Sequence, residues 1–400
     1  MNELDKKFQK LGVDNAPGQN TATKGESPNN ANILVDFSHG DVDAFEPIPE
    51  SLNTFIEGVN LGGEQAYTEY KGDGIIRKVV AEKLEYFTNT DIDYLSEMII
   101  TPGTQGALFL AIGSLVTKND KVAIIEPDYF ANRKIVEFLE ANIISIELDY
   151  LNTKTGAGLN FNKLEEVFKT GVKLFIFSNP NNPTGAIYSE VEIKEIAKLA
   201  KKYNVNVIID QLYSRLLYEN NDFTHFCALD KELYENIVTI TGPSKTESLS
   251  GYRLGVAFGS ARIIERMEKL QAIVSLRAGG YNQSVLKLWF AEPEHWLEDR
   301  IKKHQLIRDE IISKFKEVED LVKVRTTEAG SYLFPEVLRL NINIKEFVEK
   351  LRYQENVIVT PGTEFGPQFT NSFRINFSQD YENTVEAINR IIRVIKECSS

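Results

Sequence analysis

Residues 241–255, with the sequence TGPSKTESLSGYRLG, place one lysine in a small polar turn that follows an apolar run. The amine of this residue, Lys245, can form a Schiff base with pyridoxal phosphate if the phosphate group is held nearby. Ser244 and Arg253 are suited to hold it, because a guanidinium binds phosphate oxygens as a rigid fork. The fragment alone is equally consistent with a solvated lysine and a surface arginine, so it needs partners elsewhere in the chain.

Two further polar clusters follow apolar runs, each at the carboxyl end of a predicted strand. The run 172–177 precedes the cluster 178–185, and the run 205–209 precedes the cluster 210–213. Open α/β sheets bind their ligands along this edge of the strands. We therefore expect the two clusters and the lysine turn to converge on one small molecule.

The order of these segments resembles that of the class I/II aminotransferases, a large pyridoxal-phosphate-dependent family that includes aspartate aminotransferase. In that family a tyrosine and Gly-x-x-x-x-Arg block precedes a Gly/Thr turn, an aromatic residue after proline, Asn-Pro-x-Gly, Asp-x-x-Tyr, Ser-Lys and a late arginine. The corresponding segments here are YTEYKGDGIIR at 67–77, PGTQG at 102–106, PDY at 127–129, NPTG at 182–185, DQLY at 210–213, SK at 244–245 and FR at 373–374. The resemblance covers nearly the whole chain.

The resemblance implies that Lys245 carries pyridoxal phosphate and later moves the proton between the substrate's Cα and the cofactor. Asp210 would keep the pyridine nitrogen protonated, since an adjacent carboxylate raises the pKa of that nitrogen. Tyr213 and Asn182 would hydrogen-bond the phenolic oxygen of the ring, and Tyr129 would stack on the ring face. An aspartate that merely starts a turn and a packing tyrosine are the alternatives for Asp210 and Tyr129.

The phosphate needs several donors and a positive field. Gly103, Thr104 and Gln105 form a predicted turn before a helix at 107–115, so their N–H groups would face the anion with the helix dipole behind them. In the family a tyrosine of the neighbouring subunit also binds the phosphate, and the matching residue here is Tyr67. The resemblance therefore implies a homodimer with shared active sites.

One position departs from the family pattern. Relatives often carry a phosphate-binding serine three residues before the lysine, where this chain has Gly242. We expect the hydroxyl of Thr241 or Ser244 to compensate.

Substrate recognition is assigned to two arginines and an early glycine. Arg374 suits the planar α-carboxylate of an amino acid, next to Asn182. The alternative, an arginine in an edge strand of the small domain, is disfavoured because the surrounding sequence FRINF resembles the family pattern. Gly40 resembles a family glycine whose missing side chain lets substrate approach the backbone, and His39 beside it is interpreted as a packing or capping residue. Arg277 lies close to where dicarboxylate-specific relatives place an arginine that reaches the neighbour's site; a surface ion pair is its alternative.

The composition agrees with an enzyme of this kind. Acidic residues outnumber basic ones 58 to 45 among 400 residues, and the net charge of -13 argues against nucleic acid or an anionic membrane as partner. Two cysteines imply no disulfide framework, and four scattered histidines give no metal spacing. The start, MNELDKK, lacks a signal-peptide pattern, and no apolar run is long enough for a bilayer. We expect a cytoplasmic enzyme.

The predicted fold is α/β, with a mostly parallel sheet sandwiched by helices and a smaller α+β domain at the C-terminus. Residues 1–50 would form an N-terminal arm and part of the small domain, 51–290 the large cofactor-binding domain and 291–400 the small domain. The first 30 residues are polar and indicate a mobile arm or a strap over a partner. Strands are predicted at 121–126, 174–178, 205–210, 237–241 and 255–259, a long helix at 296–318, and short strands at 331–334 and 373–377.

The function that follows is transfer of an amino group between an L-amino acid and a 2-oxo acid by a ping-pong pyridoxamine mechanism, with acidic substrates if Arg277 acts as described. Enzymes of this architecture also include β- and γ-eliminating lyases and amino-acid oxidases, so these stay open. A pyridoxal-phosphate-binding regulator without turnover is disfavoured by the acidic balance and the lack of a DNA-binding extension.

Overall fold

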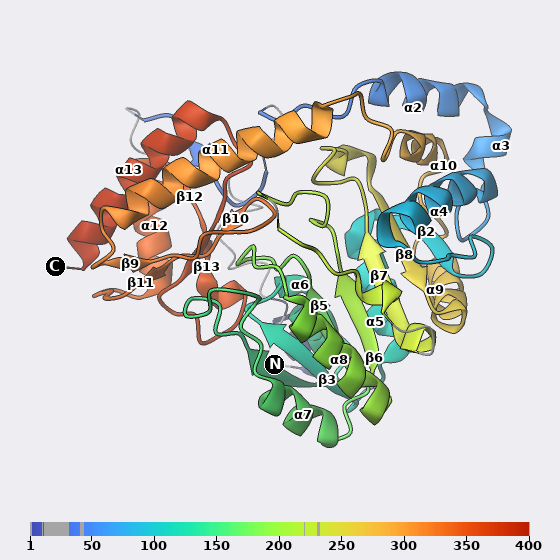
Figure 1. Cartoon of the computed structure of the whole chain (residues 1–400), viewed down its shortest axis with the longest axis horizontal. Helices are drawn as coiled ribbons and strands as arrows, with labels where there is room; N and C mark the ends of the chain where they lie inside the picture. The colour runs from blue at the N-terminus through green and yellow to red at the C-terminus, as the bar shows by residue number, and fades with distance from the viewer. Residues whose placement is uncertain are drawn as a thin grey trace.

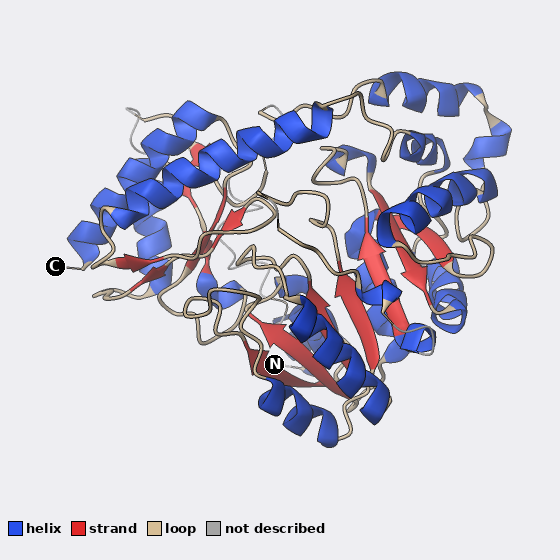
Figure 2. Ribbon diagram, viewed as in Figure 1, coloured by secondary structure: helices blue, strands red, loops and turns tan. Residues whose placement is uncertain are grey.

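A seven-stranded sheet forms the centre of the larger part of the molecule, and a smaller part of helices and short strands lies beside it (Figures 1 and 2). The computed structural model describes residues 2–9, 11, 32–40, 44–219, 221–229 and 233–399. No helix in these ranges is both long and apolar enough to cross a membrane.

The large sheet is mostly parallel, as predicted. Strand β8 runs antiparallel to both of its neighbours, β2 and β7, and the remaining pairings are parallel. The strands β3, β5 and β7 have the predicted bounds, and β6 and β8 differ only at their first residue. In spatial order the strands are β2 (Met98–Pro102), β8 (Leu254–Gly259), β7 (Ile237–Thr241), β6 (Asn206–Asp210), β5 (Leu174–Ser178), β3 (Lys121–Glu126) and β4 (Asn142–Glu147).

Both faces of the sheet are covered by helices because successive strand residues point to opposite faces. In β3, Val122 and Ile124 pack into one core with α5 (Gly103–Leu115), α6 (Phe130–Phe138) and α9 (Ala261–Val274). Ala123 and Ile125 pack into the opposite core with α7 (Phe161–Lys169) and α8 (Glu190–Tyr203). At the β2 end, α4 (Gly74–Thr88) closes a third core. The short helices α2 (Ser51–Asn60), α3 (Gly63–Ala66) and α10 (Gly280–Gln283) lie beyond α4 (Figure 1).

The smaller part is built around α11 (Trp296–Lys316), which confirms the predicted long helix. Its core also contains Val35, Phe37 and Phe45, because β1 (Val35–Asp36) pairs with β12 (Val357–Ile358). The predicted division of the chain at residues 50 and 290 stays a prediction. The remaining elements are β9 (Val322–Lys323), β10 (Tyr332–Leu333), β11 (Glu336–Val337), α12 (Ile344–Glu355), β13 (Thr360–Pro361), β14 (Phe373–Asn376) and α13 (Tyr381–Cys398).

The described start of the chain is the helix α1 (Glu3–Gln9). Phe8 meets Phe138 at the end of α6 edge to face, with ring centroids 6.2 Å apart, and Lys7 pairs with Glu140 at 3.3 Å. The rest of the predicted mobile arm, residues 12–31, lies outside the described residues.

Candidate active site

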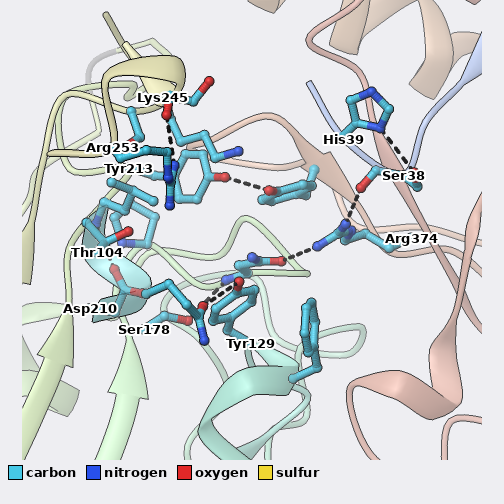
Figure 3. A pocket seen from close by; sticks show the side chains of 18 residues that line it. Ser38, His39, Thr104, Tyr129, Ser178, Asp210, Tyr213, Lys245, Arg253 and Arg374 are labelled. Atoms are coloured by element: carbon cyan, nitrogen blue, oxygen red, sulfur yellow. Dashed lines mark hydrogen bonds between the residues drawn. The ribbon is translucent and has the colours of Figure 1, made fainter. Parts of the chain in front are cut away.

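A cavity of about 170 Å³ opens where the parallel strands end, between the large sheet and the smaller part (Figure 3). It brings together most of the residues that the sequence singles out. Those that line it are Thr104, Gln105, Tyr129, Asn182, Asp210, Tyr213, Ser244, Lys245, Arg253 and Arg374. The predicted convergence of three distant polar clusters is therefore confirmed.

Strand register explains why these side chains meet. Ser178 at the end of β5 is paired with Asp210 at the end of β6, and Asp210 is paired with Ile240 of β7. The chain leaves each strand at the same edge, so the loops carrying Asn182, Tyr213 and Lys245 begin side by side. Strand β14 of the smaller part supplies Arg374 from the opposite side, as Figure 3 shows.

Asp210 lies buried on the floor of this cavity. Burial raises the pKa of its carboxyl to about 6, and the hydrogen bond from the Leu212 N–H, at 3.0 Å, opposes that shift. A buried carboxylate is stabilised when a cation lies against it. Asp210 therefore fits a ligand that presents a positive group.

The opposite end of the cavity is suited to an anion. Helix α5 begins at Gly103, so the prediction that residues 103–106 form a turn before the helix is wrong. Thr104 and Gln105 instead belong to the first turn, whose N–H groups have no partners within the helix and can bind an anion. Gly103 permits this arrangement, because its φ is +75° and a Cβ there would lie 2.6 Å from Nη2 of Arg253.

Thr104 accounts for the missing serine at position 242. A Cβ built on Gly242 would lie 3.2 Å from Cγ2 of Thr104, so the threonine side chain occupies the space that a serine would enter. Thr104 and Ser244 line the cavity, and Thr241 does not. Of the two hydroxyls expected to compensate, only that of Ser244 is therefore well placed, and Thr104 adds another.

Arg374 is held flat in the cavity wall. Its Nη1 donates to Oδ1 of Asn182 at 3.1 Å, and its Nη2 donates to the carbonyl of Ser38 at 2.8 Å. The guanidinium lies over the ring of Tyr332, 4.4 Å from the centroid. Its Nε is buried without a hydrogen-bond partner among the described residues. A planar anion such as a carboxylate fits this arrangement.

Sequence reasoning missed Tyr332. Its hydroxyl accepts a hydrogen bond of 2.5 Å from the hydroxyl of Tyr213, and both tyrosines are buried. The sequence predicts the segment around it only as a short strand. The signal that could have found it is its pairing with the strand that bears Arg374, which the sequence does not specify. His39, interpreted from the sequence as a packing or capping residue, also lines the cavity. The lining residues without a predicted role are Ser38, Phe130, Ser178, Pro180, Leu212 and Ser250.

Four predicted site residues do not line this cavity, and one of them, Gly103, lies at the start of α5 beside Arg253. Gly40 lines a smaller cavity of about 30 Å³ behind Lys245, where a Cβ would meet no described atom closer than 3.5 Å. Tyr67 is 76% exposed, and the guanidinium of Arg277 lies over its ring at 4.7 Å. Tyr67 and Arg277 are therefore neighbours at the surface, away from the cavity of their own chain.

Comparison with known proteins agrees with this architecture. Residues 32–391 match the family model described as aminotransferase class I and II. The crystal structure of an aspartate aminotransferase from Rhodobacter sphaeroides is 52% identical, with a TM-score of 0.92 and full coverage of both chains. An aspartate aminotransferase from Pyrococcus horikoshii is 29% identical over 82% of this chain and 83% of its own. An aromatic-amino-acid aminotransferase from Thermococcus litoralis is 24% identical in sequence, over 87% of this chain and 89% of its own length.

The chain belongs to the class I and II aminotransferase family. It is an aminotransferase, and its family uses pyridoxal phosphate. The cavity fits this cofactor at both ends. A buried carboxylate at Asp210 suits a protonated pyridine nitrogen, and the first turn of α5 with Arg253 suits a phosphate.

Proposed function

We propose that this enzyme uses Lys245 to bind pyridoxal phosphate and that it transfers amino groups between acidic amino acids and 2-oxo acids. The observation that carries the proposal is a single cavity that holds the Lys245 amine, the buried Asp210 carboxylate and the Arg374 guanidinium. When bound, pyridoxal phosphate supplies an electron sink that weakens the Cα–H bond of an amino acid. The surrounding residues would bind the substrate and transfer the protons.

Lys245 is the proposed general base. Its amine would accept the proton that leaves the substrate Cα and would hold it for return to the substrate-derived carbon skeleton or to the cofactor. Its turn is held by Arg300, whose Nη1 donates to the carbonyl of Thr246 at 2.8 Å and to Oγ of Ser248 at 2.6 Å. This support keeps the amine close to one position through both half-reactions.

The remaining residues orient the two ligands. Asp210 would hold the pyridine proton, and Tyr213 and Asn182 would donate to the phenolic oxygen. Tyr129 offers an aromatic ring to one face, and its hydroxyl is fixed by a 3.0 Å hydrogen bond to Gln105. Arg374 would exchange its contact with Asn182 or Ser38 for the α-carboxylate of the substrate. The phosphate donors would be Thr104, Gln105, Ser244 and Arg253, together with Tyr67 from a second subunit.

A homodimer is part of the proposal. Exposed apolar residues occur in α2, at the start of α4 and at the end of α9, and these three helices lie on the same side of the large sheet's β2 end (Figure 1). A patch of this kind marks a protein contact, and a two-fold dimer would pair it with itself. Tyr67 lies within it, and Arg277 stacks on Tyr67. The exposed residues are Leu52, Ile56, Val59, Leu61, Tyr67, Tyr70, Ile75, Ile273, Val274 and Leu276.

Acidic substrates are supported by the relative from Rhodobacter sphaeroides, which is called an aspartate aminotransferase. A dimer would also bring Arg277 of one subunit towards the cavity of the other. A guanidinium there would bind the distal carboxylate of aspartate, glutamate or 2-oxoglutarate and would select against neutral side chains.

The proposal is tested with purified enzyme, aspartate and 2-oxoglutarate. We expect oxaloacetate and glutamate in equal amounts, whereas release of free ammonia would indicate an eliminating lyase. Lys245→Ala should lose the visible absorbance of the covalently bound cofactor and roughly a hundredfold or more of the rate. Lys198→Ala, on the surface of α8, is the matched control and should behave like wild type. A Lys245→Ala enzyme that transaminates at near wild-type rate would refute the assignment.

A further inference from the structure

Tyr332 lies between two residues of the proposed site, Tyr213 and Arg374. On one side its hydroxyl meets that of Tyr213 at 2.5 Å, with the two rings edge to face and 5.3 Å between centroids. On the other side its ring faces the guanidinium of Arg374. Tyr332 lines the cavity together with Lys245.

The backbone fixes this position firmly. Tyr332 is paired with Asn376 of β14, and its carbonyl accepts a 2.8 Å hydrogen bond from the hydroxyl of Thr327. Tyr213 belongs to the loop after β6 of the large sheet. Gly330 packs against the ring of Tyr213, 3.4 Å from the position of a Cβ. Residues of the smaller part of the molecule therefore contact both the ring and the hydroxyl of Tyr213, and they fix the position of the hydroxyl oxygen.

A hydroxyl has one proton and two lone pairs, so the direction of this hydrogen bond can reverse. If Tyr213 turns its proton towards the phenolic oxygen of the cofactor, Tyr332 can donate its own proton to the oxygen of Tyr213. A hydroxyl whose oxygen accepts a hydrogen bond becomes a stronger donor, because bonds in a chain polarise one another.

We propose that Tyr332 is a positioning residue that orients the Tyr213 hydroxyl and strengthens it as a hydrogen-bond donor to the phenolic oxygen of the cofactor. This inference rests on the proposed function, and in particular on the role of Tyr213.

The charges around the pair support this direction. Burial raises the pKa of Tyr213 well above its usual value. Burial also acts to raise the pKa of Tyr332, yet the positive charges of Lys245 and Arg374 and the hydrogen bond from Tyr213 leave it lowered. Asp210 and Tyr129 face the same pair and oppose this lowering. The positive charges of Lys245 and Arg374, which do not depend on the direction of the hydrogen bond, thus favour Tyr332 as a donor.

The test is an absorbance titration of the holoenzyme, which follows the pH at which the visible band of the Lys245-bound cofactor changes. A donor to the anionic phenolic oxygen favours the deprotonated cofactor and lowers this pKa, so Tyr213→Phe should raise it. Tyr332→Phe keeps the ring over Arg374 and should raise it by a smaller amount, roughly 0.4–1 pH unit. Because Tyr332 acts through Tyr213, the double variant should match Tyr213→Phe alone.

The control is Tyr150→Phe, which alters another buried tyrosine whose hydroxyl contacts the carbonyl of Phe334. It should not move the titration. We also expect Tyr332→Phe to lower kcat a few-fold while KM for the amino acid stays nearly constant, since the Arg374 contact is retained.

The outcomes separate this inference from the proposed function. A shift in Tyr213→Phe without one in Tyr332→Phe, or additive shifts in the double variant, would overturn the inference and leave the function intact. Unshifted titrations in both single variants would overturn the inference and the role of Tyr213. A wild-type enzyme without any cofactor band would overturn the proposed function itself.

Discussion

Asp210 illustrates how one side chain acquires its chemistry from its place. Its position at the end of β6 buries the carboxyl, and burial raises its pKa to about 6. A protonated pyridine nitrogen against this carboxylate would favour the ionised form again, because an opposite charge lowers the pKa of an acid. The same contact would keep the proton on the ring, where the electron sink requires it.

Asp210→Asn should therefore leave the fold largely intact and slow the chemistry. A neutral amide cannot stabilise the pyridine proton in the same way, and losing one such charged contact costs about 2–4 kcal/mol, so the single-turnover rate should fall more than tenfold. Rapid mixing with aspartate measures that rate, and thermal unfolding checks the fold. Asp149→Asn, at the exposed end of a loop, serves as control. A wild-type single-turnover rate would remove Asp210 from the mechanism.

At the scale of elements, α11 connects the lysine turn to the smaller part of the molecule. Arg300 reaches the carbonyl of Thr246, and His304, one helical turn later, is buried with its ring 3.8 Å from that of Phe45. Nδ1 of His304 donates to the carbonyl of Arg300 at 2.9 Å, so Nε2 accepts from the hydroxyl of Ser378 at 3.0 Å. An accepting Nε2 requires a neutral imidazole, whereas the Nδ1 contact persists in either protonation state.

Because of burial, the pKa of His304 is lowered to about 3, from roughly 6.5 in an unfolded chain. Below pH 6.5 the unfolded chain takes up a proton that the folded chain does not, so this group's contribution to stability is lost as the pH falls towards 3. His304→Gln should reduce the pH dependence of the unfolding free energy between pH 6 and 4 by about 1.4 kcal/mol per pH unit.

Urea unfolding at a series of pH values measures this slope. The comparison is between slopes, because buried Asp128 and Glu247 have pKa values raised by burial to about 7 and contribute with the opposite sign in both proteins. His295→Gln, on the surface, should leave the slope as it is in wild type. An unchanged slope in His304→Gln would show that His304 does not govern the acid response.

At the scale of the whole molecule, the cavity of one chain contains the residues proposed to bind the cofactor and the α-carboxylate, but Tyr67 and Arg277 do not line it. These two residues stack on each other within an exposed apolar patch. Nη1 of Arg277 donates to the carbonyl of Thr68, and its Nε is buried without a hydrogen-bond partner among the described residues. A second copy on this patch would give both side chains a ligand to contact.

Arg277→Ala should therefore change specificity more than general activity. We expect kcat/KM for aspartate to fall roughly tenfold or more while that for alanine changes little, since a charged hydrogen bond contributes about 1.5–3 kcal/mol. Sedimentation equilibrium should give a dimer for both proteins. Arg266→Ala, on the outer side of α9, is the control. An equal decrease in kcat/KM for both substrates, or a monomeric wild-type enzyme, would show that Arg277 does not select the substrate.

Most of the strands of the large sheet, and the polar residues that follow them, could be predicted from the amino-acid sequence. Apolar runs such as 174–178 and 237–241 appear as β5 and β7 with the predicted bounds, because burial on both faces selects continuous apolar segments. Parallel strands end at one edge, so Asn182, Asp210 and Lys245 could be expected to converge without knowledge of the packing.

Contacts between segments far apart in the chain could not be predicted and are visible only in the folded structure. It starts α5 at Gly103, where Arg253 crosses over the glycine, and it lets Thr104 fill the space at Gly242. It also brings Tyr332 from the smaller part of the molecule to Tyr213. Local patterns record which residues are buried or end a strand, whereas these contacts depend on how the two parts pack together, and no pattern within a short segment encodes that.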